Sequence, residues 1–136
     1  HLQSIPDDTR LQKLGSVLVH SLQVGLQGPG IALYLSAATG KATSAHYPWW
    51  PMPEAIRACA LGMHLDPGLN LQTLWKRCDH AFFTDYWQAS RGFAFQTRDD
   101  LEPVDFVPAT PDLDPGYHTG LSLLCATQTI GLLLAR

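Results

Sequence analysis

Two places in the sequence hold side chains that could bind a sugar and move a proton. The stretch 47–55, Tyr-Pro-Trp-Trp-Pro-Met-Pro-Glu-Ala, places Trp49, Trp50 and Glu54 where a helix is expected to begin. Flat indole faces offer stacking surface, and a carboxylate accepts hydrogen bonds from hydroxyl groups. The second place is Tyr117-His118, just before a long apolar stretch. Histidine can act as a general acid or base near neutral pH, so His118 is a candidate proton carrier.

A purely structural interpretation competes with this one. Tryptophan is usually well buried, so Trp49 and Trp50 could belong to the core. Glu54 would then be an ordinary first-turn carboxylate, held by the positive end of the helix dipole. The two interpretations differ in whether Glu54 and His118 come together in space.

The overall composition limits the classes of function. The 136 residues fit one domain or part of one, and only 15% are charged against 46% hydrophobic. So little charge predicts more buried surface than an ordinary small domain has, including surface buried against a segment outside this sequence. The net charge is −3 and no basic run occurs, so nucleic acid is not an expected partner.

The compartment is predicted from the cysteines and from the absence of apolar targeting patterns. Cys59, Cys78 and Cys125 have no Cys-x-x-Cys spacing, and all three fall in expected helices. They are interpreted as small buried thiols in a reducing compartment. No signal peptide and no run of 18 apolar residues is recognisable, so we expect a cytoplasmic protein without a membrane partner.

Apolar periodicity predicts four helices, with two short strands between them. The helices are expected from the caps at 7–9 to about 25, from 51 to 63, around 71–82, and from about 116 to 136. Glycine-led strands are expected at 30–35 and 92–96, each followed by a turn and an extended return. The order helix, strand, turn, return, helix therefore occurs twice, which indicates an internal repeat.

The two helices of each repeat differ in character. The leading helices carry the ordinary charges, whereas residues 119–135 include no acidic or basic side chain. A helix that is apolar all round is expected to be buried on every side. Alternating outer and inner helices predict an α/α solenoid or a closed α/α toroid. In either fold the loops that lead into the inner helices share one rim, so Glu54 and His118 should both face it.

Three segments together resemble the N-acylglucosamine 2-epimerase superfamily, which includes cellobiose 2-epimerases and aldose–ketose isomerases of the mannose and sulfoquinovose type. They are Trp49-Trp50-x-x-x-Glu54-Ala55, the hairpin that begins Gly92-Phe93, and Tyr117-His118. The resemblance covers most of the chain from about residue 11. It implies an all-α (α/α)6 toroid with short β-hairpin loops on one rim. Residues 1–136 would be the C-terminal part of that single domain, with about four of twelve helices.

The resemblance also implies an activity and roles for particular residues. His118 would be the general acid/base at C2 of a free, in some members N-acylated, aldose, and the reaction would pass through a cis-enediol(ate). Glu54 would bind the sugar or orient a histidine. The substrate walls would be Trp49, Trp50, Phe93 and Tyr117. No metal or other cofactor is implied. The expected partners are the small sugar and the N-terminal part of the same toroid, and a homodimer is left open.

The sequence departs from the family pattern at several positions. The family has a tryptophan at Phe93 and an arginine at Leu121 or Ser122. Its second catalytic histidine lies on the preceding inner helix, and His1 is too close to the first helix to be assigned to that role. The second histidine is therefore expected upstream of this sequence if these residues are the C-terminal part of a longer enzyme; the alternative is a degenerate relative of the family.

Two alternative functions stay open at this stage. The first is a non-catalytic carbohydrate-binding or structural fragment of an α/α toroid. The second is a glycosidase that uses Asp85 and Asp105, because such toroids also hold glycosidases and a carboxylate pair is what glycoside hydrolysis needs.

The remaining histidines are weaker candidates. His20, His64 and His80 are expected to be solvated or half-buried, whereas His46 lies near the rim and could touch substrate. No histidine–cysteine pair has standard zinc spacing, so a metal site is not expected.

Overall fold

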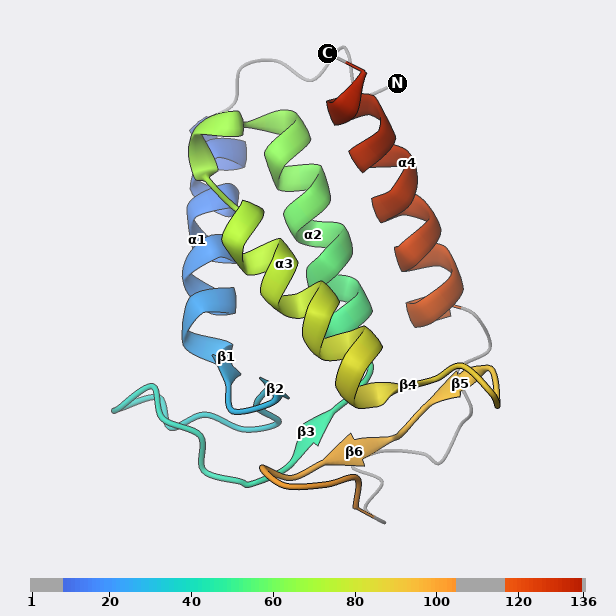
Figure 1. The fold of residues 1–136 in the computed structure, drawn as a ribbon. Helices are drawn as coiled ribbons and strands as arrows, with labels where there is room; N and C mark the ends of the chain where they lie inside the picture. The colour runs from blue at the N-terminus through green and yellow to red at the C-terminus, as the bar shows by residue number, and fades with distance from the viewer. Residues whose placement is uncertain (1–8, 105–116, 136) are drawn as a thin grey trace.

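The computed structural model describes residues 9–104 and 117–135, and this part of the chain is predominantly helical (Figure 1). Its α-helices are α1 (Thr9–Gly25), α2 (Pro51–Leu65), α3 (Gln72–Ala81) and α4 (Ser122–Leu134). A 3₁₀ turn (Pro67–Leu69) joins α2 to α3, and π-helical turns follow α3 (Phe82–Tyr86) and precede α4 (Tyr117–Leu121). Helices were predicted at these four places, and those predictions are confirmed.

Within residues 9–104 and 117–135, six short strands form three antiparallel pairs. They are β1 (Leu26–Gln27), β2 (Gly30–Ile31), β3 (Tyr47–Pro48), β4 (Trp87–Gln88), β5 (Phe93–Ala94) and β6 (Thr97–Arg98). β1 pairs with β2 and β4 pairs with β5, so each repeat has its own hairpin after its leading helix. β3 pairs with β6, and this pair links the loops of the two repeats. The strands predicted at 30–35 and 92–96 are present but shorter.

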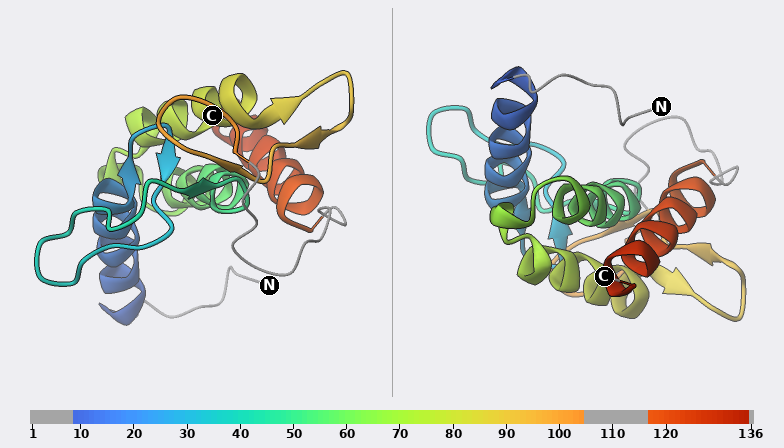
Figure 2. Two further views of the ribbon diagram at one scale, coloured as in Figure 1. Left: turned by 90° about the horizontal axis from the view of Figure 1, so that it is seen from below. Right: turned by 90° about the horizontal axis from the view of Figure 1, so that it is seen from above.

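The helix α2 occupies the centre of the bundle and contacts α1, α3 and α4 (Figure 2). All the strand pairs lie beyond one end of the bundle, the end at which α2 and α4 begin (Figure 1). The hairpins that follow α1 and α3 therefore lie at the same end of the bundle as the starts of α2 and α4, as expected for loops that lead into the inner helices (Figure 1).

Proline chemistry fixes where α2 begins. Pro51 and Pro53 lie in its first turn, where the backbone N–H groups have no partner inside the helix and a proline costs nothing. The N–H of Met52 donates to the carbonyl of Trp49 at 3.0 Å, which closes the first turn. Glu54 follows in the same turn, at the end of the helix that favours an anion.

Small residues let α4 approach α2 closely. Ser122, Ala126 and Thr129 are the buried residues of α4, and their spacing puts them on one face. The buried positions of α2 are Met52, Pro53, Ala55, Ile56, Cys59 and Ala60. The core continues into α3 and its π-helical turn through Cys78, Phe82 and Tyr86, each 0% exposed.

The expectation that the last helix is buried on every side is wrong for the described chain. Leu121, Leu124, Leu132 and Leu134 are 48%, 57%, 58% and 84% exposed. The physical reason is that α4 packs on α2 through a single face, and no described element covers the opposite one.

In the described part of the chain, no helix has both the length and the apolar character needed to cross a membrane.

The cysteines are free thiols, as expected, but they are not all buried. Cys59 and Cys78 are buried in the contact between α2 and α3, whereas Cys125 on α4 is only half-buried. Cys125 follows the exposed Leu124 and so sits at the edge of the face that meets α2.

Candidate functional site

Glu54 and His118 meet where α2 and α4 begin. The Nδ1 atom of His118 lies 3.1 Å from Oε1 of Glu54. The two residues are 64 positions apart in the sequence, so only the packing of the two helices brings them together. Their side chains are 35% and 26% exposed, which leaves the pair accessible from the rim.

The contacts around Glu54 define the tautomer of His118. The same oxygen, Oε1, accepts a hydrogen bond from the hydroxyl of Ser122 at 2.9 Å. The guanidinium of Arg57 bonds the other oxygen, Oε2. An ionised carboxylate can only accept hydrogen bonds, so the hydrogen in the bond between Glu54 and His118 is placed on Nδ1 of His118. In the neutral ring, Nε2 is then the basic nitrogen.

Two indole rings hold the imidazole of His118. The ring of Trp49 meets it edge-on, with centroids 5.8 Å apart and an interplanar angle of 80°. The ring of Trp50 lies at 6.0 Å with a tilt of 40°. Trp49 is buried and anchored, because its Nε1 donates to Oε1 of Gln96 at 3.2 Å, whereas Trp50 is 40% exposed.

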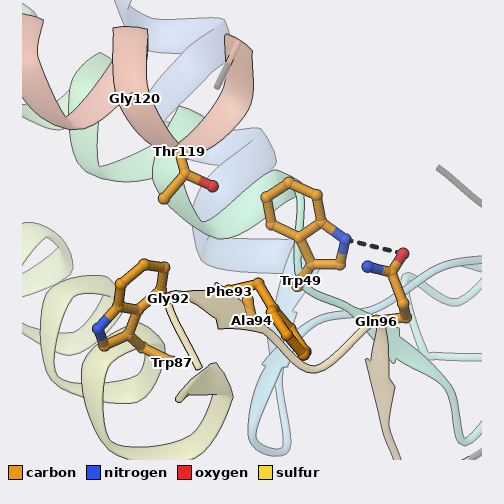
Figure 3. A pocket seen from close by; sticks show the side chains of 8 residues that line it. All are labelled: Trp49, Trp87, Gly92, Phe93, Ala94, Gln96, Thr119 and Gly120. Carbon is orange, nitrogen blue, oxygen red and sulfur yellow. Dashed lines mark hydrogen bonds between the residues drawn. The ribbon is translucent and has the colours of Figure 1, made fainter. Parts of the chain in front are cut away.

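A pocket of about 250 Å³ adjoins this group (Figure 3). Its lining is Trp49, Trp87, Gly92, Phe93, Ala94, Gln96, Thr119 and Gly120. Figure 3 shows Trp49 and Trp87 on opposite sides, with Thr119 and Phe93 between them. Three aromatic rings with one amide and one hydroxyl give stacking surface and a few polar groups, which is the usual character of a small-molecule site.

The β4–β5 hairpin builds one wall of the pocket. Gly92 has a φ of +74°, a conformation that other residues rarely adopt, and its N–H donates to the carbonyl of Gln88 at 2.9 Å. This turn brings Phe93 back to pair with Gln88, and Phe93 lines the pocket. Neither Glu54 nor His118 lines the pocket itself, but Trp49 belongs to both groups and Thr119 follows His118 in the chain.

Most of the residues predicted to form a site lie near one another in the structure. His118 contacts Glu54, Trp49 and Trp50, and Phe93 lines the pocket together with Trp49. The backbone of Tyr117 opens the π-helical turn, but its side chain lies outside the described part of the chain.

Sequence reasoning missed five residues of this region: Arg57, Trp87, Gln96, Thr119 and Ser122. Two of them had a readable signal, because Arg57 lies three residues after Glu54 and Ser122 lies four residues after His118. Both spacings put side chains on one helix face. Trp87 and Gln96 reach the pocket only through the β4–β5 and β3–β6 pairings, which carry no comparable local signal.

The weaker candidates lie apart from this group or cannot be located. His20 and His80 are exposed on α1 and α3, and His64 is half-buried near the end of α2. His46 is half-buried just before β3. Of the two aspartates considered for glycoside hydrolysis, Asp85 is in the π-helical turn after α3 and Asp105 lies outside the described residues. Across 9–104 and 117–135, no three histidine, cysteine or acidic side chains are placed to hold a metal ion.

Comparison of the sequence and the structure with protein-family models, curated proteins and solved structures found no match.

Proposed function

We propose that the protein is a sugar 2-epimerase or aldose–ketose isomerase of the cytoplasm, and that these residues form part of an (α/α)6 toroid. The observation that carries the proposal is the bond between Nδ1 of His118 and Oε1 of Glu54, 3.1 Å long, beside an aromatic pocket. It combines a proton carrier of defined tautomer with a surface on which a sugar ring could stack.

The proposed reaction begins with the open-chain aldose. Nε2 of His118 takes the proton from C2, the C2–H electrons form the C1–C2 double bond, and the carbonyl oxygen becomes the enediolate oxygen. Glu54 stabilises the imidazolium that results. Return of a proton to the other face of C2 gives the epimer. Return of a proton to C1, with transfer of the hydroxyl proton from O2 to O1, gives the ketose. The second proton-transfer group of this scheme is expected from the part of the toroid upstream of residue 1.

A specific observation favours one alternative, a protein that binds carbohydrate without reacting. The pocket is lined by Trp49, Trp87 and Phe93 but not by Glu54 or His118. A sugar could therefore stack in the pocket while the bond between Glu54 and His118 serves only to join α2 to α4. The two functions differ in whether the hydrogen at C2 exchanges with solvent.

Hydrogen–deuterium exchange at C2 tests the proposal. N-acetylmannosamine, mannose and cellobiose would be incubated in D2O with the natural gene product that contains these residues, and followed by NMR. We expect exchange with at least one sugar and a loss of about 10²-fold or more in His118→Asn, because a general base is removed. His20→Asn changes an exposed histidine on α1 and should leave the rate unchanged.

Two results would overturn the proposal. Exchange that survives His118→Asn removes His118 from the mechanism. Absence of exchange with every sugar, together with binding of one of them, would support the non-catalytic alternative.

A further inference from the structure

The carboxylate of Glu54 has a hydrogen-bond partner from each of the two helices besides His118. On α2, Arg57 bonds Oε2 from one turn further along the helix. On α4, Ser122 donates its hydroxyl to Oε1 at 2.9 Å, from one turn after His118. Both oxygens of the carboxylate are therefore held, one from each side of the contact between α2 and α4.

The burial of Ser122 shows that its hydroxyl has a specific use. Ser122 is 0% exposed and shares its helix face with Ala126 and Thr129. An alanine would satisfy the packing at this position, whereas a buried hydroxyl needs a partner. Thr129 gives a direct comparison, because its hydroxyl donates to the carbonyl of Cys125 within the same helix. The hydroxyl of Ser122 instead crosses to the other helix and bonds Glu54.

The torsion that turns a glutamate carboxylate is broad, so one bond to a histidine does not fix the plane of the group. If the plane turns, Nδ1 of His118 loses this acceptor, and the carboxylate no longer selects the nitrogen that carries the hydrogen. Two additional donors, one on each oxygen, prevent that rotation. Such outer partners of a site are known to set which nitrogen of a histidine carries the proton.

We infer that Arg57 and Ser122 are positioning residues that lock the carboxylate of Glu54 and thereby hold His118 as the Nδ1–H tautomer with Nε2 as its basic nitrogen. Neither residue touches the substrate in this assignment. The consequence for catalysis rests on the proposed function, whereas the consequence for the tautomer does not.

The tautomer of His118 is measured directly by ¹⁵N NMR of histidine-labelled protein, because protonated and unprotonated ring nitrogens have well-separated shifts. The signal is assigned from its loss in His118→Gln. In the unsubstituted protein we expect a single species with hydrogen on Nδ1. Ser122→Ala should give a mixture of the two tautomers.

The substitution Glu54→Gln has a predicted direction of its own. The guanidinium of Arg57 requires an oxygen on its side, so the amide NH2 would face His118 and act as a donor. Nδ1 must then accept, and we expect the hydrogen to move to Nε2. Arg57→Gln removes the group that holds Oε2 of Glu54, so a mixture of His118 tautomers is expected. Arg57→Lys keeps the positive charge and should partly restore the Nδ1–H tautomer.

Matched controls separate positioning from loss of structure. Thr129→Val removes a buried hydroxyl from the same face of α4 without touching Glu54. Arg77→Gln removes an exposed arginine from α3, a helix that contributes no residue to the pocket or to the group around Glu54. Both should leave the tautomer of His118 unchanged. If they alter it as much as Ser122→Ala and Arg57→Gln do, the effect is general and the inference is wrong.

The kinetic test uses the same variants in the C2 exchange assay. Ser122→Ala should lower kcat by about tenfold with KM nearly unchanged, as expected when a supporting partner of a site residue is lost. A single unchanged tautomer in both Ser122→Ala and Arg57→Gln would overturn the inference even if the enzyme is active. A tautomer that shifts as expected, in a protein without C2 exchange, would support the positioning role and remove the proposed activity.

Discussion

At the scale of the residue, Glu54 is the side chain that links the two helices at the rim. Its carboxylate joins α2 to α4 by accepting from His118 and Ser122, and it also holds Arg57. A residue that only capped α2 would bond the backbone of its own helix or face water. The cross-helix bonds therefore give Glu54 a role beyond capping α2, either in a site or in joining α2 to α4.

The two buried cysteines predict how stability depends on pH. Burial raises the pKa of the Cys59 thiol from 9.0 to about 11, and that of Cys78 from 9.0 to about 12, where the nearby Cys59 adds to the effect. The folded protein holds these protons more tightly than the unfolded chain. The stabilisation is complete below about pH 9 and is lost as the pH rises through the folded values. If both shifts are fully expressed, we expect the free energy of unfolding to fall by about 5 kcal/mol between pH 8 and pH 11, about half of it from each thiol.

Urea unfolding at a series of pH values measures this change. Burial also raises the pKa of Tyr86, so the double variant Cys59→Ala/Cys78→Ala should lose most, but not all, of the alkaline decrease. Cys125→Ala, at a half-buried thiol, should keep it. An unchanged decrease in the double variant would mean that other groups cause it.

At the scale of the element, short hairpins hold the helices in register. Tyr86, at the end of the π-helical turn after α3, donates its hydroxyl to the backbone carbonyl of Tyr47 in β3 at 3.1 Å. Gly30 of β2 passes directly against this ring. The side chain of Tyr86 thus connects the end of the leading helix of the second repeat to β2 and β3.

The substitution Gly30→Ala tests this connection. An added methyl group would clash with the hydroxyl of Tyr86, which is 0% exposed and cannot move away freely. We expect a loss of about 1–3 kcal/mol in the free energy of unfolding. Gly131→Ala is the control, because the methyl would meet no described atom within 4 Å. It should leave stability unchanged or raise it by up to about 1 kcal/mol, and equal losses in both variants would contradict the argument.

At the scale of the whole molecule, α2 is the shared core and α4 is covered on one side. Ile56 on α2 is 1% exposed, whereas Leu124 and Leu132 on α4 are more than half exposed. The same kind of side chain thus has opposite environments in the two apolar helices. The difference follows from position, because α2 has neighbours on several sides and α4 contacts mainly α2.

This asymmetry predicts which apolar residues stabilise the described fold. Ile56→Ala should cost about 2–4 kcal/mol, because it leaves a cavity in a closed core. Leu124→Lys/Leu132→Lys should change the free energy of unfolding by less than about 1 kcal/mol, because exposed helix positions tolerate lysine. Chemical denaturation at low protein concentration measures both. A loss above 2 kcal/mol in the double lysine variant would show that these leucines are covered in the folded protein.

The sequence by itself determined the helices and the ends at which they begin. Prolines at 51 and 53 and the apolar spacing are local properties, so they predict α2 and the position of Glu54 in its first turn without knowledge of the fold. The twofold order of helix and hairpin was also readable, and it predicts that Glu54 and His118 share a rim.

Only the tertiary structure decided what these residues touch. The bonds from Ser122 and Arg57 to Glu54, and the arrival of Trp87 and Gln96 in the pocket, depend on how α4 and two strand pairs dock on α2. Docking also decided that one face of α4 stays exposed, although its sequence is apolar all round. Apolar composition shows that a helix tends to bury its surface, but it does not show which face finds a neighbour. The hydrogen-bond partner of a polar atom depends on distance and angle, and only the folded chain sets these.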